Sequence, residues 1–131
     1  MLTIALIAKD EANLLILNNP METFLPIAYL QNQFIPFANA KLSIATHALQ
    51  YGTGAVGGLR GIPNPQNADE ILLFRLEKHC QRLSNSARVL HMSLSVPQIK
   101  SVIIEFLQHN RPTVPFYIRP RFASNARKQP K

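Results

Sequence analysis

Tyr117 and Arg119 are the residues of this sequence whose types and spacing first suggest a binding role. The apolar run from Val114 to Ile118 predicts a strand, and Pro120 lies just beyond it. Because successive side chains of a strand point to opposite faces, Tyr117 and Arg119 are expected on the same face. A phenol and a guanidinium placed in this way suit the wall of a cleft. A structural ion pair is the alternative for Arg119.

A glycine-rich segment, residues 47–60, holds four of the five glycines of the chain. Glycine permits close approach of the backbone to another group, and it also permits a sharp bend in a barrel-like strand. The spacing is not that of a dinucleotide-binding GxGxxG motif, and no phosphate-loop lysine follows. We therefore expect close backbone packing here, with a strand bend as the alternative.

Two amphipathic helices must position the residues of the second half of the chain. The first is predicted from about Arg75 to His91, because apolar residues recur every three or four positions at Leu76, Cys80, Leu83, Ala87 and Leu90. Arg82 lies in this helix and, taken alone, is a solvated surface charge. The second helix is predicted from Val96 to Asn110, with Ser95 as its N-cap.

Short apolar runs predict the strands. Residues 27–30 and 34–37 flank a polar turn and indicate a β-hairpin, in which Pro36 favours an edge position because proline cannot donate to a ladder. Residues 62–70 have the composition of a loop, and Ile71 to Phe74 is expected to form a short buried strand. The sequence thus predicts an α+β fold, a mostly antiparallel sheet packed against two helices.

Three segments are expected along the chain. Residues 1–20 are interpreted as an N-terminal extension of uncertain status, either a peripheral helix or sequence upstream of a true start at Met21. Residues 21–120 are the globular domain. Residues 121–131 are a basic tail with little apolar content, for which we expect disorder.

Composition excludes several function classes. The formal net charge is +7, but four of the positive charges lie in the last eleven residues, which argues against nucleic-acid binding. No apolar run is long enough to span a membrane, and the histidines show no metal-ligand spacing. The single cysteine, Cys80, is expected to be a buried apolar residue rather than a reactive thiol. We expect a cytoplasmic protein without a metal.

Four groups of residues together resemble the small N-terminal domain of the branched-chain amino acid aminotransferases, class IV enzymes with pyridoxal phosphate. They occur in the family's order across about three-quarters of the chain: residues 29–37, His47-Ala-Leu-Gln-Tyr-Gly-Thr with Gly58-Leu-Arg60, Phe74-Arg-Leu with His79-Cys-Gln-Arg-Leu83, and Phe116-Tyr-Ile-Arg-Pro120. The resemblance implies an exchange of amino groups between branched-chain amino acids and 2-oxoglutarate.

The resemblance also implies roles for individual residues. Arg82 matches the arginine that binds the cofactor phosphate, where a guanidinium donates two parallel hydrogen bonds. Tyr117 is implied to line the substrate pocket and Arg119 to recognise a substrate carboxylate. Tyr51 matches a tyrosine that reaches into the neighbouring subunit of a dimer, with a buried core tyrosine as the alternative. Val56 stands where many relatives have phenylalanine, which puts the substrate preference in doubt.

After Pro120 the sequence departs from the family, which continues into a large domain with the lysine that holds pyridoxal phosphate as a Schiff base. None of the six lysines of this chain has that context. We expect a truncated domain that is inactive alone and does not hold the cofactor stably. The alternatives are an interaction module that pairs with a separate large domain or an intact homologue, and a fragment of a D-amino acid aminotransferase or aminodeoxychorismate lyase.

Overall fold

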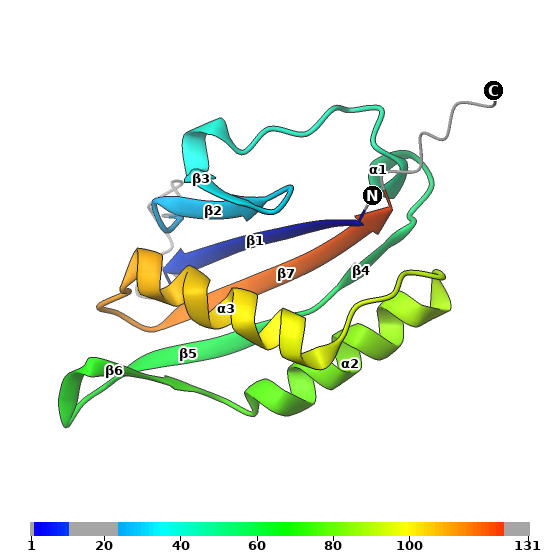
Figure 1. The fold of residues 1–131 in the computed structure, drawn as a ribbon. Coiled ribbons are helices and arrows are strands. Elements are labelled where there is room, and N and C mark those ends of the chain that lie inside the picture. Colours follow the sequence, from blue (N-terminus) through cyan, green and yellow to red (C-terminus); the bar gives the residue numbers. More distant parts are fainter. Residues whose placement is uncertain (1, 11–23, 125–131) are drawn as a thin grey trace, which may run out of the picture.

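Seven strands form one sheet, and two long helices cover one of its faces (Figure 1). The structure is a computed structural model that describes residues 2–10 and 24–124. The strands are β1 (Leu2–Asp10), β2 (Ile27–Leu30), β3 (Gln33–Pro36), β4 (Gly54–Val56), β5 (Leu59–Asn64), β6 (Asn67–Leu73) and β7 (Phe116–Ser124). The helices are α1 (His47–Gln50), α2 (Leu76–Val89) and α3 (Val96–Asn110), with a 3-10 turn at Phe37–Asn39.

The sheet is antiparallel throughout and has the strand order β3-β2-β1-β7-β5-β6. The short strand β4 precedes β5 in sequence and pairs with a later part of β7, residues 121–123, than β5 does. The predicted α+β class is confirmed, as is the hairpin of β2 and β3 at the edge of the sheet. No helix in the described part of the chain is long and apolar enough to cross a lipid bilayer.

Strand β1 is central in the sheet, which differs from the expectation of a peripheral N-terminal extension. It pairs with β7 along its whole length, from Leu2 opposite Ser124 to Asp10 opposite Phe116, and with β2 on its other side. Figure 1 shows β1 and β7 side by side. A pairing between the two ends of the chain leaves no local signal in the sequence. Met21, the alternative start, lies outside the described residues.

The expected boundary of a tail at residue 121 is also wrong. Strand β7 continues through Pro120 to Ser124, and Phe122 is fully buried. The strand therefore includes Pro120, where the sequence predicted the end of the domain, and Arg121, where it predicted the start of the tail. The remaining residues of the predicted tail, 125–131, lie outside the described residues.

The two predicted helices are present with nearly the predicted bounds. Ser95 caps α3 in a capping box, in which its side chain accepts from the Gln98 backbone N–H and the Gln98 side chain accepts from the Ser95 backbone. An ion pair of 3.2 Å between Glu77 and Lys100 joins α2 to α3. In the same layer the Ser84 hydroxyl donates to the Leu94 carbonyl at 2.7 Å.

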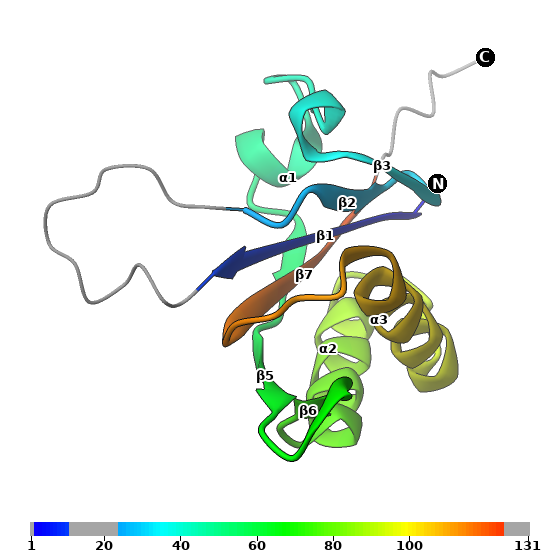
Figure 2. The ribbon, with the colours of Figure 1, turned by 90° about the vertical axis from the view of Figure 1, so that its left-hand side faces the viewer.

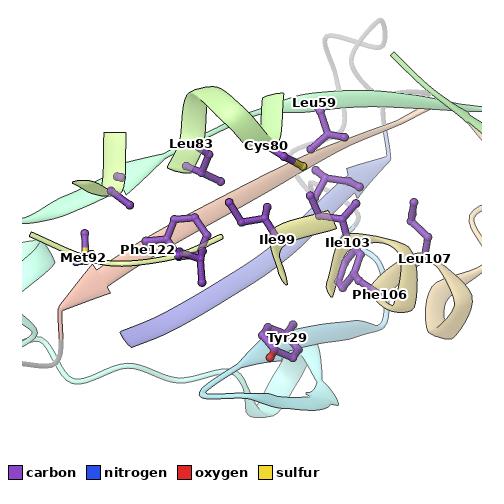
Figure 3. Packing of buried hydrophobic residues seen from close by; sticks show 14 of the residues in the cluster. Tyr29, Leu59, Cys80, Leu83, Met92, Ile99, Ile103, Phe106, Leu107 and Phe122 are labelled. Carbon is purple, nitrogen blue, oxygen red and sulfur yellow. The ribbon is translucent and has the colours of Figure 1, made fainter. Parts of the chain in front are cut away.

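The core lies between these helices and the sheet (Figure 3). Its largest members, Phe106, Phe116 and Phe122, are each fully buried. Cys80 is 1% exposed and belongs to the same cluster, which confirms the interpretation as a buried apolar residue. Figure 3 shows the α2 residues Cys80 and Leu83 pointing into this cluster.

Residues 62–70 form parts of two strands, not a loop, and β6 is an exposed edge strand rather than a buried one. Leu72 is 46% exposed. Pro63 is accepted within β5 because β7 pairs only with residues 59–61 of that strand, so β5 has a single neighbour at this point. The composition of the turn masked the strands on either side of it.

Helix α1 lies on the face of the sheet opposite to α2 and α3, as the view in Figure 2 shows. It contacts β7, where it covers Ala123, which is 6% exposed. The rest of that second face, over β4, β5 and most of β7, carries no helix. We call this surface the open face.

Candidate functional site

Tyr117 and Arg119 lie on the open face, as their spacing predicts. Phe116 and Ile118 are fully buried toward the helices, so the residues that alternate with them point the other way. Tyr117 is 36% exposed, and Arg119 is exposed. Among residues 24–124, whose side chains the structure describes with the exception of Ser124, Arg119 makes no ion pair.

Gly58 determines where the Tyr117 side chain rests. A Cβ atom at Gly58 would lie only 1.7 Å from the Tyr117 hydroxyl oxygen, so the ring occupies the space that any side chain would fill. Gly61 is packed in the same way against the ring of Phe116, at 2.2 Å from its Cζ. Three of the four glycines of the 47–60 segment, Gly54, Gly57 and Gly58, therefore serve close approach to β7, which was the first of the two expectations.

The open face is rich in arginine. Arg121 follows Arg119 at the next position on the same face, and Arg60 pairs with Tyr117 across β5 and β7. Strands β4, β5 and β7 contain no acidic residue. Like charges gathered on one surface favour an anionic ligand group, and a guanidinium can bind a carboxylate through two parallel hydrogen bonds.

Val56 belongs to the same surface. It alternates with the buried Ala55, is 43% exposed and stands opposite Arg121 in the pairing of β4 with β7. An aliphatic side chain beside guanidinium groups gives this face both an apolar and a charged part. The structure thus brings together Val56, Tyr117 and Arg119, three of the four residues predicted to contact substrate.

The fourth, Tyr51, lies apart from them at the end of α1. Its side chain is 73% exposed, which excludes the alternative of a buried core tyrosine. The ring meets His47 edge-on with 5.2 Å between ring centroids. Gly52, which follows, has a φ of 65° and so turns the chain in a conformation that favours glycine.

Arg82 lies in the helical layer and not on the open face. It is exposed on α2, and among the described residues it makes no ion pair. The next residue, Leu83, packs against the sheet, because a Cβ atom at Gly57 would lie 3.4 Å from a Leu83 methyl carbon. Helix α2 and Tyr117 therefore meet the backbone at adjacent glycines, Gly57 and Gly58, from opposite faces.

This junction lies at an edge of the sheet. Strand β6 pairs only with residues 61–64 of β5, so among the described strands β4 and the start of β5 have β7 as their sole neighbour. The Gly57 backbone N–H donates to the Pro120 carbonyl at 2.8 Å and fixes the junction on β7. Arg82 and the open face are thus brought to the same edge from two layers.

Burial and neighbouring charges shift the pKa values of two side chains on α2, His79 and Cys80. Burial, followed by the positive charges of Arg82 and Arg75, lowers the pKa of His79 below its usual value. The His79 Nδ1 atom is buried and has no hydrogen-bond partner among the described residues. Burial raises the pKa of the Cys80 thiol to about 11, which disfavours the reactive thiolate.

Comparison with known proteins relates this arrangement to one enzyme family. No family model matches the chain. A probable branched-chain-amino-acid aminotransferase of Synechocystis is 57% identical over 100 residues, which are 76% of this chain and 33% of that protein. The Escherichia coli branched-chain amino acid aminotransferase superposes with a TM-score of 0.61 at 27% identity, over 72% of this chain and 31% of that one.

Three quarters of the chain is homologous to branched-chain aminotransferases. The branched-chain aminotransferase of Thermoproteus uzoniensis, in its crystal structure with norvaline, has the same fold, with a TM-score of 0.63 at 24% identity, over 75% of this chain and 35% of that one. The chain spans about a third of the length of these branched-chain aminotransferases and matches an N-terminal part of them.

Branched-chain aminotransferases depend on pyridoxal phosphate. Residues on α2 and at its start fit the phosphate of that group, because Arg82 on the helix and Arg75 just before it are exposed guanidinium groups without an ion-pair partner among the described residues. His79 lies between them in the sequence, and its ring is half-buried with no hydrogen-bond partner in the described part of the chain.

Sequence reasoning missed part of this site. Arg121 was assigned to the tail, although its position two residues after Arg119 carries the same alternation signal as Tyr117. Arg60 belongs to the pattern that resembles the family, but its place opposite Tyr117 depends on strand register and leaves no local signal. His79 had no signal beyond its spacing from Arg82.

Proposed function

We propose that this chain supplies the small domain of a branched-chain amino acid aminotransferase, with one wall of the substrate cleft and an anchor for the cofactor phosphate. The observation that carries the proposal is the junction at Gly57 and Gly58. Helix α2 with Arg82 and the open face with Tyr117 meet there at one edge of the sheet.

Arg82 is the proposed phosphate anchor. A guanidinium donates two parallel hydrogen bonds to a phosphate dianion, and the exposed position of Arg82 leaves its donors accessible. Helix α2 is held from behind by the packing of Leu83 and by the ion pair between Glu77 and Lys100. The anchor is therefore carried by a fixed element.

The open face is the proposed substrate side. Arg119 binds the carboxylate of the substrate, Tyr117 supplies an aromatic wall, and Val56 offers a smaller apolar contact to the side chain of the amino acid. A missing aromatic contact changes substrate discrimination by about 1 to 3 kcal/mol. The class of substrate we propose is a branched-chain amino acid with 2-oxoglutarate as the amino-group acceptor.

Pyridoxal phosphate, when bound, provides the electron-withdrawing group that makes transfer of the amino group feasible. The residues of this chain bind and orient, but none of its lysines is a proposed catalytic base. We infer that the 131-residue chain alone does not catalyse transamination, and that this activity requires the part of the site that the longer relatives carry.

The exposed apolar surface around α1 supports a partner. Ile44 is 77% exposed and Leu49 is 65% exposed, and with Leu42, Ala48, Arg121 and Ala123 they line a hollow of about 280 Å³. Such a surface is expected to be covered in an assembly. We propose a dimer or a complex with a large domain, with Tyr51 facing the partner, in the cytoplasm.

The phosphate anchor is tested with pyridoxine 5′-phosphate, which has no aldehyde and cannot react with lysine. Binding to the full chain is measured by calorimetry, with unphosphorylated pyridoxine as the reference ligand. Although stable attachment of the cofactor is not expected of the chain alone, the wild-type chain is expected to bind the phosphate ester reversibly, and Arg82→Gln is expected to weaken this binding by about a hundredfold, the size of lost charge-assisted hydrogen bonds. Arg88→Gln, on the same helix, is the control and should bind as the wild type does.

The inference on activity has its own test. One sample of the chain is incubated with pyridoxal phosphate, reduced with borohydride and analysed by mass spectrometry, and a second, unreduced sample with pyridoxal phosphate is given leucine and 2-oxoglutarate and assayed for glutamate. We expect no stoichiometric adduct at a single lysine and no glutamate. One modified lysine per chain together with steady turnover would contradict the account.

A further inference from the structure

His79 shares a stripe of α2 with Arg82. His79, Arg82 and Ser86 follow one another at intervals of three and four residues, which places them along one side of α2, and Arg75 immediately precedes this helix, near enough for its charge to act on His79. Ser86 is tied into the helix by a hydrogen bond of 3.0 Å to the Arg82 carbonyl. The stripe and Arg75 together present two guanidinium groups with an imidazole between them in the sequence.

This stripe faces away from α3. Glu77, which pairs with Lys100 of α3, and Ser84, which donates to the Leu94 carbonyl just before α3, lie on the other flank of the helix. Leu83, one position after Arg82, contacts the Gly57 junction at the edge of the sheet. The imidazole of His79 thus lies on the flank that borders the proposed phosphate site.

The hydrogen-bonding capacity of His79 is unused within the described part of the chain. Its Nδ1 atom is buried without a partner, and its side chain makes no hydrogen bond with any described residue. A buried polar atom left unpaired costs free energy, so such atoms usually have a function or an unseen partner. A ligand cannot reach the buried Nδ1 atom, but the other ring nitrogen, Nε2, is not buried and has no hydrogen-bond partner among the described residues, so Nε2 is the atom that can donate to a ligand.

The charges around His79 have one sign. The positive charges of Arg82 and Arg75 both lower the pKa of the His79 ring. The strands under α2, β4 and β5, contain a single charged residue, Arg60, which points to the opposite face. From α3, Lys100 is engaged by Glu77 on the far flank. An anion held at Arg82 would therefore meet no carboxylate of the described residues on this side of α2.

We propose that His79 is a second phosphate-binding residue, whose imidazole donates a hydrogen bond to the anion that Arg82 holds. The inference depends on the proposed role of Arg82 and adds a residue and a protonation event to it. Without an anion the ring is neutral at pH 7, because burial and the two arginines lower its pKa. The negative charge of a bound dianion offsets the positive charges of the two arginines and so favours the protonated ring of His79.

The experiment uses the full chain and pyridoxine 5′-phosphate as the probe. The titration of each histidine ring is followed by NMR with and without the probe. The pKa of His79 is expected to rise by about one unit when the probe binds, because an opposite charge close to the ring favours its charged form. His91, exposed beyond the end of α2, is the internal reference, and its ring signals should not change when the probe is added.

Variants separate this inference from the proposed function. His79→Gln is expected to weaken binding of the probe about tenfold, the size of one hydrogen bond to a charged group, while His91→Gln has no effect. In Arg82→Gln the pKa of His79 should start higher, because one repelling charge is gone, and should no longer respond to the probe.

Each outcome decides between the two proposals. If Arg82→Gln loses binding while His79→Gln binds as the wild type and the ring does not respond, His79 has no such role and the anchor remains. If Arg82→Gln binds as tightly as the wild type, both proposals fail. The NMR titration is made on the wild-type chain, so it decides the matter even if the His79 variant does not fold.

Discussion

Gly58 and Gly61 both pack against β7, but an added methyl group would meet different obstacles at the two positions. At Gly58 the obstacle is the hydroxyl end of Tyr117, a side chain on the open face that can swing outward. At Gly61 it is the ring of Phe116, which is fully buried and has no room to move. The two glycines thus allow function and stability to be tested separately.

Gly61→Ala is expected to lower the free energy of unfolding by about 1 to 3 kcal/mol through overpacking of the core. Gly58→Ala should cost less stability but displace Tyr117 from its resting place. Urea unfolding of both variants, with near-ultraviolet circular dichroism to follow the tyrosines, measures the two effects. Equal stability losses in the two variants would show that the Tyr117 side chain is not free to move.

Cys80 is predicted to be an inert thiol with a defined effect on stability at high pH. Burial, and to a lesser degree Glu77, raises the pKa of the thiol from 9.0 to about 11, while Lys100 opposes the shift. The stability associated with this group is complete below pH 9 and declines as the pH rises toward 11, because the unfolded chain releases the proton first.

The measurement compares urea midpoints of the wild type and Cys80→Ala between pH 8 and about 11. The wild type should lose more stability over this range than the variant, which lacks the titrating group. At pH 8 the native chain should react with a disulfide reagent far more slowly than the unfolded chain does. Rapid labelling of the folded protein would refute the buried position.

At the residue scale the sequence predicted the common face of Tyr117 and Arg119 because alternation in a strand is a local rule. It could not predict that Tyr117 covers Gly58, since that contact depends on the register of β5 against β7. Arg121 was missed because Pro120 was taken as the end of the strand.

Among the elements, α3 has the clearest local cause. Ser95 and Gln98 satisfy each other's backbone groups at its first turn. Ser95→Ala is expected to lower the free energy of unfolding by about 1 kcal/mol. Ser101→Ala, an exposed serine within the same helix, is the control and should be neutral or slightly stabilising. Thermal unfolding of the two variants distinguishes them, and an unchanged Ser95→Ala melting curve would mean that the cap contributes nothing.

Both helices were predicted nearly to the residue because a 3.6-residue period and caps are encoded locally. The strands were predicted less well. The β5–β6 hairpin was hidden by the prolines and asparagines around its turn, and β1 resembled an appendage because its partner strand lies at the other end of the chain. Strand pairing is a long-range property, and a single sequence does not show it.

The whole molecule depends on β1 to join its two halves. This strand lies between β7 and the β2–β3 hairpin, which otherwise contacts the rest of the molecule mainly through α3. Asn110 of that helix exchanges hydrogen bonds of 3.0 and 3.1 Å with the Ile27 backbone. Without β1, these contacts with α3 would be the main connection between the β2–β3 hairpin and the rest of the molecule.

A chain that begins at Met21 is therefore expected to be unstable. Removing a central strand exposes the edge of β7, and domains have only about 5 to 15 kcal/mol of stability to lose. We expect residues 21–131 to aggregate or to lose cooperative thermal unfolding, as followed by circular dichroism and gel filtration. A shortened chain that melts as the full chain does would show that β1 is dispensable.

At this scale the claim is that the chain carries the substrate wall and phosphate anchor of an aminotransferase. It is tested most directly in the Synechocystis relative, by replacing the 100 matched residues with those of this chain. The account predicts that the chimera transfers the amino group of leucine to 2-oxoglutarate, and that Arg82→Gln lowers this activity at least about tenfold through lost phosphate binding. A chimera that folds and binds pyridoxal phosphate but forms no glutamate would contradict it.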